Sequence, residues 1–240
     1  MCHGSRPTAC TVFRSRPSIT QRDKFMPQRA LAEKRPYLVA SIVAAISYYV
    51  LRDAYISGIS LALIKGAAIA FLAAYALSRH RGRDGRWVAA VMSVAALADV
   101  VIEFAPAGGG VLYFVTLLLA AGLFLTHRRA GTTATQGITA AALLLLTPLI
   151  CWSLSQEPRI ALYGLALGAM AGSAWISRFS RYHVGVGAVL FVAAAFLLIA
   201  QMRFLPHDSA AGWFIWPLYY CGQFLICTGI IQTLRRDHQA

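Results

Sequence analysis

The chain consists of long apolar stretches separated by short charged segments. Charged residues make up 13% of it and hydrophobic residues 58%, whereas a soluble domain usually has about 25% charged residues. A surface with so few charges cannot face water, and a membrane-spanning helix needs about 20 mostly apolar residues. The sequence therefore predicts an all-α protein, a polytopic transmembrane helical bundle of about eight spans. The predicted spans cover residues 37–51, 59–78, 87–104, 110–126, 137–153, 160–177, 184–202 and 213–234.

Lysine and arginine are unevenly distributed between the two sides of this bundle. One side, which includes both chain ends, carries 18 of the 22 such residues, and the loops of the other side carry only Arg52, Arg159 and Arg203; Lys65 lies within a span. Cytoplasmic segments of membrane proteins collect these residues, so both termini are predicted to be cytoplasmic. The same distribution explains the net charge of +13 without nucleic acid, and we expect the membrane, not nucleic acid, as a partner.

The predicted membrane domain, residues 37–234, lies between two short tails. The N-terminal tail, 1–36, carries eight basic residues against two acidic ones and has no apolar core of a secretory signal peptide. We expect it to be disordered; a transit peptide and a translation start at Met26 are alternatives. The C-terminal tail is residues 235–240.

Cysteine and histidine do not form a metal-binding pattern. The five cysteines include no CxxC, and three of them lie in apolar spans. His80, His127 and His183 fall in predicted cytoplasmic loops, where we interpret them as solvated residues. No metal and no cofactor are predicted.

Three ionisable residues lie inside the predicted spans, namely Lys65, Asp99 and Glu103. Charges at membrane depth cost at least a few kcal/mol each, so they usually face the bundle interior and mark function. At a rise of 1.5 Å per residue, Lys65 and Asp99 lie about 9 and about 8 Å from the outer ends of their spans. Glu103 follows Asp99 by one helical turn on the same face. The alternative to a functional site is a structural ion pair between Lys65 and Asp99.

Polar residues of later spans reach the same half of the bundle. Tyr219, Tyr220 and Gln223 lie about 9–15 Å below the outer end of the last span, and Tyr163 is shallower. We interpret the group as the lining of a polar cavity that opens toward the outer leaflet. As alternatives, the two tyrosines of the last span are interfacial aromatics, and Gln223 is a hydrogen-bonding residue between helices.

Five stretches within the spans resemble motifs of a known family. The most specific is PLYYCGQFLI at 217–226, with a proline, two tyrosines and a glutamine in order. The others are LALIKG at 61–66, ALADVVIEF at 96–104, LYGLALGAM at 162–170 and GAVLFV at 187–192. On these stretches the chain resembles the YhhN family of membrane proteins, which includes the lysoplasmalogenases.

This resemblance implies a multi-pass hydrolase of the bacterial inner (plasma) membrane. Its substrate would be a lysophospholipid-like lipid, a lysoplasmalogen, whose vinyl-ether bond is hydrolysed to a fatty aldehyde and a glycerophospho-alcohol. Hydrolysis of a vinyl ether starts with protonation of its β-carbon, which requires a carboxylic acid that is protonated near neutral pH. Burial and a second nearby carboxylate both favour the protonated form, so Asp99 and Glu103 are the predicted catalytic residues. The predicted substrate-binding residues are Lys65, Tyr163, Tyr219, Tyr220 and Gln223.

The chain departs from the family pattern at several polar positions. Ala194 and Ala195 stand after GAVLFV, where the family usually has Ser-Asp, and Leu118 stands at the position of a family histidine. These departures leave two alternatives open. One is a non-catalytic lipid-binding member, and the other is a small transporter that uses the ionisable residues of the spans as an ion or proton site.

Overall fold

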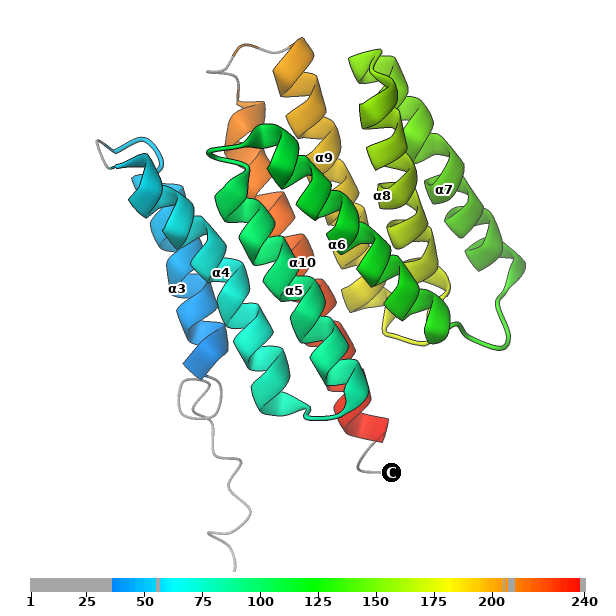
Figure 1. Ribbon diagram of the computed structural model, residues 1–240. Helices are drawn as coiled ribbons and strands as arrows, with labels where there is room; N and C mark the ends of the chain where they lie inside the picture. The colour runs from blue at the N-terminus through cyan, green and yellow to red at the C-terminus, as the bar shows by residue number, and fades with distance from the viewer. Residues whose placement is uncertain (1–35, 55–56, 205, 207–209, 238–240) are drawn as a thin grey trace, which may run out of the picture.

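The computed structural model describes residues 36–54, 57–204, 206 and 210–237. In this part of the chain the secondary structure is helical without strands, which confirms the all-α prediction, and each predicted span corresponds to one α-helix (Figure 1). The helices are α3 (Pro36–Leu51), α4 (Gly58–Arg79), α5 (Arg83–Val101), α6 (Pro106–Thr126), α7 (Ala134–Ser155), α8 (Pro158–Ile176), α9 (Val186–Arg203) and α10 (Ala211–Asp237), with a π-helical turn, η2 (Arg181–Gly185), before α9. The predicted tail at 1–36 lies, apart from Pro36, outside the described residues.

Six of the described helices are long and apolar enough to cross a membrane: α4, α6, α7, α8, α10, and α9 together with η2. The helix α3 is apolar but has only 16 residues. The helix α5 carries Arg83, Asp84 and Arg86 in its first turn and Asp99 near its end. The structure therefore supports a multi-pass membrane protein, while the count of eight spans and the side of the termini stay predictions.

Successive helices run antiparallel, and the last helix lies among the earlier ones (Figure 1). The helix α10 packs against α4, α5 and α9. Its close approach to α9 depends on two glycines that face each other, because a β-carbon on Gly187 would lie 2.8 Å from the backbone oxygen of Gly222. Small residues of this kind let membrane helices approach closely, and here they bring α10 to the centre of the fold.

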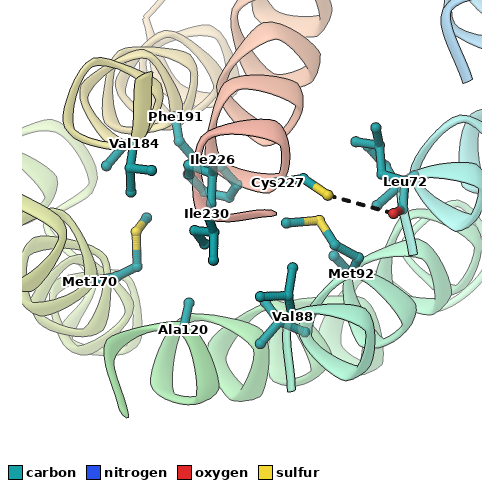
Figure 2. Packing of buried hydrophobic residues seen from close by; sticks show 14 of the residues in the cluster. Leu72, Val88, Met92, Ala120, Met170, Val184, Phe191, Ile226, Cys227 and Ile230 are labelled. Atoms are coloured by element: carbon teal, nitrogen blue, oxygen red, sulfur yellow. Dashed lines mark hydrogen bonds between the residues drawn. The ribbon is translucent and has the colours of Figure 1, made fainter. Parts of the chain in front are cut away.

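The apolar core lies around α10 in the half of the bundle that is opposite to the α5–α6 turn. Figure 2 shows buried side chains of α4, α5, α8 and α10 meeting there, among them Leu72, Met92, Met170 and Ile230. The thiol of Cys227 donates a hydrogen bond of 3.5 Å to the backbone oxygen of Leu72. In this half of the bundle, buried side chains therefore surround α10.

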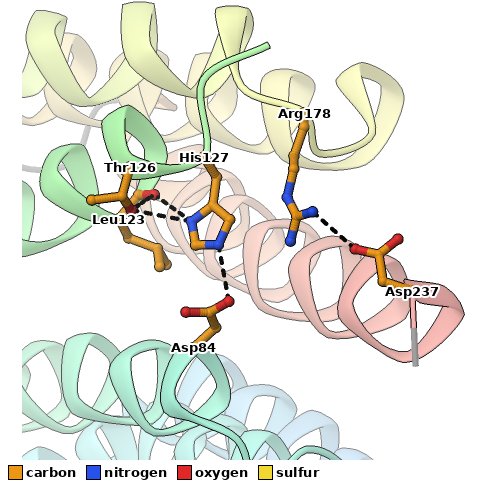
Figure 3. A network of polar contacts seen from close by, with 6 residues as sticks. All are labelled: Asp84, Leu123, Thr126, His127, Arg178 and Asp237. Atoms are coloured by element: carbon orange, nitrogen blue, oxygen red, sulfur yellow. Dashed lines mark hydrogen bonds and ion pairs between the residues drawn. The ribbon is translucent and has the colours of Figure 1, made fainter. Parts of the chain in front are cut away.

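One end of the bundle carries the 80–82, 127–133 and 177–180 connections, and we call it the basic end. Polar side chains of different elements contact one another there. Nε2 of His127 lies 2.9 Å from the Asp84 carboxylate, and Arg178 forms an ion pair of 3.2 Å with Asp237 (Figure 3). His80 is also buried, with 8% of its surface exposed. The interpretation of His80 and His127 as solvated residues is therefore wrong, because the loops fold back onto the helix ends.

Candidate functional site

Asp99 is buried where three helices meet. It lies near the end of α5, with none of its surface exposed. The hydroxyl of Tyr113 on α6 donates to Oδ1 at 2.5 Å, and the hydroxyl of Tyr219 on α10 donates to Oδ2 at 2.8 Å. A buried carboxyl group is costly unless its oxygens are hydrogen-bonded. The two tyrosines meet this requirement from opposite helices.

Aromatic packing fixes the position of the Tyr219 hydroxyl. The rings of Tyr113 and Tyr219 lie edge to face, with centroids 6.1 Å apart, and Phe191 and Trp216 contact Tyr219 at 5.3 and 5.6 Å. Gln223, one turn further along α10, also interacts with the Tyr219 side chain. Edge-to-face and offset pairs are the favoured arrangements of aromatic rings, so the donor that faces Asp99 is held rigidly.

The intramembrane lysine pairs with the second carboxylate and not with the first. Nζ of Lys65 lies 2.6 Å from Oε1 of Glu103, so the alternative of an ion pair between Lys65 and Asp99 is not found. The predicted span continued as a helix to residue 104, but α5 ends at Val101. Glu103 therefore lies in the turn and reaches across to α4 instead of continuing the face of Asp99.

A cavity of about 420 Å³ adjoins these groups. Its volume falls in the range of ligand sites, which are clefts of about 300–1,000 Å³. Its polar lining consists of Tyr48, Arg52, Lys65, Asp99, Glu103, Tyr113, Tyr163, Gln201 and Tyr219. Its apolar lining includes Ile102, Phe191, Leu198, Ile199, Ile215 and Trp216. The combination suits an amphiphilic ligand, because a small set of polar groups lies beside a larger apolar wall.

The structure brings five of the seven predicted site residues to this cavity: Asp99, Glu103, Lys65, Tyr163 and Tyr219. Tyr220 and Gln223 do not line it.

Tyr220 faces α3 instead, where its hydroxyl lies 2.8 Å from Oγ of Ser41. Neighbouring residues on a helix point about 100° apart, so only one of two adjacent tyrosines faces the cavity. Gln223 shares the face of Tyr219 but lies deeper, where it supports Tyr219 and does not reach the cavity. Neither residue lines the cavity, and a substrate-binding role for them stays a prediction.

Sequence reasoning missed Tyr113, Tyr48 and Arg52. Tyr113 lies on the second arm of the α5–α6 hairpin, so its depth near Asp99 could have been found by counting from the turn. Arg52 is one of only three cations in the predicted loops of the other side. The rarity of a cation there could have marked it as a candidate site residue. Tyr48 packs against Trp216 with tilted rings whose centroids are 4.5 Å apart. Tyr48 lies on the short helix α3, and Arg52 lies in the turn that follows it.

The positions where the chain departs from the family pattern lie in different environments. Ala194 and Ala195 both line the cavity from α9. Leu118 lies on the outer face of α6, with 49% of its surface exposed, and is not part of the cavity. The alanine pair therefore contributes methyl groups to the lining where the family usually has polar side chains, whereas Leu118 does not line the cavity.

Comparison with known proteins identifies the family of this chain. No curated protein and no solved structure matches the chain. The family model of the YhhN family matches residues 61–230, a range that includes Lys65, Asp99, Glu103 and Tyr219 and leaves out α3. The match covers well over half of the chain and confirms the resemblance seen in the motifs. The protein therefore belongs to the YhhN family.

Proposed function

We propose that this protein is a membrane-embedded hydrolase of lysoplasmalogens. The observation that carries the proposal is the position of Asp99, a buried carboxyl group that faces a largely apolar cavity within a helical membrane protein. A vinyl ether carries no charge and has an alkyl chain on its β-carbon, so an apolar cavity admits it. The chemistry that it requires of the protein is a proton donor and access to one water molecule.

In the proposed mechanism, Asp99 acts first as an acid and then as a base. The protonated carboxyl group transfers its proton to the β-carbon of the vinyl ether, which leaves an oxocarbenium ion beside the new carboxylate. Water attacks the α-carbon, and Asp99 accepts the released proton. The resulting hemiacetal collapses, its hydroxyl proton moves to the departing glycerol oxygen, and the products are the fatty aldehyde and the glycerophospho-alcohol. One water molecule is consumed and Asp99 is restored.

Tyr113 and Tyr219 suit both states of Asp99. A phenolic hydroxyl is a donor and an acceptor. Both tyrosines donate when Asp99 is a carboxylate, as the geometry shows. When Asp99 is protonated, its O–H group donates to one tyrosine, which turns its own proton elsewhere. Both carboxyl oxygens of Asp99 therefore keep a hydrogen-bond partner in either state, which avoids the cost of an unpaired buried oxygen.

Lys65 and Glu103 form an ion pair of 2.6 Å at the cavity. Because the two charges of the pair cancel, it contributes polar groups to the lining and little net charge. Tyr163 also lines the cavity, where we assign it contact with the lipid.

A second candidate is a lipid-binding protein without catalytic activity. It is favoured by Ala194 and Ala195, because their methyl groups line the wall where the family usually has Ser-Asp and cannot orient water. The same cavity would then hold the lipid and leave the vinyl ether intact.

Aldehyde release from a defined lysoplasmalogen by the purified protein separates the two. The control lipids are the matched 1-acyl and 1-alkyl lysophospholipids, which lack the vinyl ether. Release of aldehyde from the vinyl ether alone supports the hydrolase. Binding of all three lipids without aldehyde release would replace it with the lipid-binding candidate.

A further inference from the structure

Arg52 is held at the cavity by two aromatic rings and a backbone oxygen. Its guanidinium carbon lies 4.3 Å from the ring centre of Trp213 and 5.3 Å from that of Tyr49. Nη1 donates a hydrogen bond of 3.0 Å to the backbone oxygen of Gly212. These contacts join the end of α3 to the start of α10. Together they hold the guanidinium group in place beside the cavity, since cation–π contacts attract the charge to the rings.

The charge of Arg52 is not matched by a buried carboxylate among the described residues. Its carboxylate contact there is with Asp53, at 3.5 Å, and the Asp53 side chain is 64% exposed. Lys65 is neutralised by Glu103, and Asp99 is bonded by two tyrosines. Arg52 lines the cavity with a side chain that is only 18% exposed. Of the two cations among the described residues that line the cavity, Arg52 is therefore the one whose charge can attract an anionic ligand.

We infer that Arg52 binds the phosphate of the lipid headgroup and so selects lipids that carry a phosphate over those that lack one. Arginine presents N–H donors in a planar fork that matches phosphate oxygens, and charged hydrogen bonds of this type are about twice as strong as neutral ones. Nε contacts Asp53 and Nη1 donates to Gly212, and among the described residues the fork keeps further N–H donors for an anion. The inference rests on the proposed function only for the identity of the lipid.

The placement also orients the ligand. Arg52 lies in the turn after α3, at the end of the bundle opposite the basic end, and Asp99 lies deeper, within α5. A lipid with its phosphate at Arg52 would place its first chain bond toward Asp99 and its alkyl chain along Phe191, Leu198 and Ile199. Because α3 precedes residues 61–230, this phosphate subsite would lie outside the part of the chain that the family model matches.

Binding of non-hydrolysable lipids tests the inference independently of catalysis. The probes are a 1-alkyl lysophosphocholine, the matched 1-alkylglycerol without phosphate, and inorganic phosphate, each with the full chain in detergent. We expect Arg52→Gln to weaken binding of the phosphate lipid by about 10- to 100-fold and to leave that of the alkylglycerol unchanged. Arg52→Lys, which keeps the charge without the fork, should give an intermediate loss.

Arg159→Gln is the matched control, because Arg159 lies at the same end of the bundle with a 92% exposed side chain and does not line the cavity. It should bind both lipids as the unmodified chain does. Equal weakening of both lipids by Arg52→Gln and Arg52→Lys, or of neither, would overturn the inference. Displacement of the lipid by inorganic phosphate at equal concentration would also overturn it, in favour of a free-anion site. Phosphate-dependent binding without aldehyde release would refute the proposed function and leave this inference standing.

Discussion

Lys65 forms an ion pair of 2.6 Å with Glu103 and leaves the Asp99 carboxylate to the hydroxyl groups of Tyr113 and Tyr219. The two carboxylates of the cavity therefore have partners of different kinds. A cation favours only the ionised form of its partner, whereas a tyrosine hydroxyl can bond to either form. This difference assigns the proton transfer of the proposed mechanism to Asp99 and leaves Glu103 as the partner of Lys65.

Replacing Asp99 by asparagine should lower aldehyde release by about 10²–10⁴-fold, the usual contribution of a general acid. The amide keeps the shape of the side chain but has no proton to transfer. The rate is measured with a defined lysoplasmalogen, and retention of the fold is checked by size-exclusion chromatography in detergent. Full activity of Asp99→Asn would exclude Asp99 as the acid and leave Glu103 as the candidate.

The ion pair of Lys65 and Glu103 should show energetic coupling in a double-mutant cycle. Glu103→Gln leaves the Lys65 charge, on a side chain that is 15% exposed, without its partner, and Lys65→Met leaves the 40% exposed Glu103 carboxylate without its own. The double change leaves neither charge. We expect the double variant to be more stable than the sum of the single losses by about 1 kcal/mol, as measured by thermal or denaturant unfolding in detergent. Additive losses would mean that the pair contributes nothing to the fold.

A tryptophan in place of Gly110 should fill the cavity without disturbing the helix packing. Gly110 lines the cavity, and a β-carbon placed there meets no atom within 4 Å. We expect lipid binding and aldehyde release to fall at least about tenfold, with little change in melting temperature. Gly137→Trp on α7 is the matched control, because its β-carbon also meets nothing within 4 Å and it does not line the cavity. Equal lipid binding by both variants would place the ligand elsewhere.

An aspartate in place of Ala195 should restore a carboxylate to the cavity wall. Ala195 lines the cavity and stands where the family usually has an aspartate. A second carboxylate can position the attacking water, so aldehyde release should rise about tenfold or more, at some cost in stability for a buried charge. Ala195→Asn, which has the same shape without the charge, is the control. A folded Ala195→Asp variant with unchanged activity would show that the alanine does not limit the reaction.

Reporter fusions should place both termini and the 127–136 loop in the cytoplasm, and the turn at 102–105 outside. This follows from the excess of lysine and arginine at the basic end. It also requires α3 and α5 to cross the membrane, although neither meets the length and composition criteria that the other six helices meet. Reporters at the two termini on opposite sides of the membrane would mean an odd number of spans and contradict the eight-span prediction.

Much of the fold followed from the sequence, because helix positions and depths depend on quantities that composition reveals. The length of each apolar stretch set the eight helices to within four residues at either end. The rise per residue placed Asp99 and Lys65 at similar depth, and both line the cavity. The family motifs pointed to the same half of the bundle and to Tyr219. These results needed no knowledge of how one helix packs against another.

Tertiary structure decided which way the side chains point. The sequence treated Tyr219 and Tyr220 alike, but only Tyr219 faces the cavity. It predicted a helix through Glu103, whereas α5 ends at Val101, so that Glu103 pairs with Lys65. A soluble helix shows its buried face by its apolar stripe, but a membrane helix is apolar on the lipid side as well as the protein side. Depth is therefore readable from such a sequence, while rotation about the helix axis is fixed only when small residues and hydrogen bonds bring the helices together.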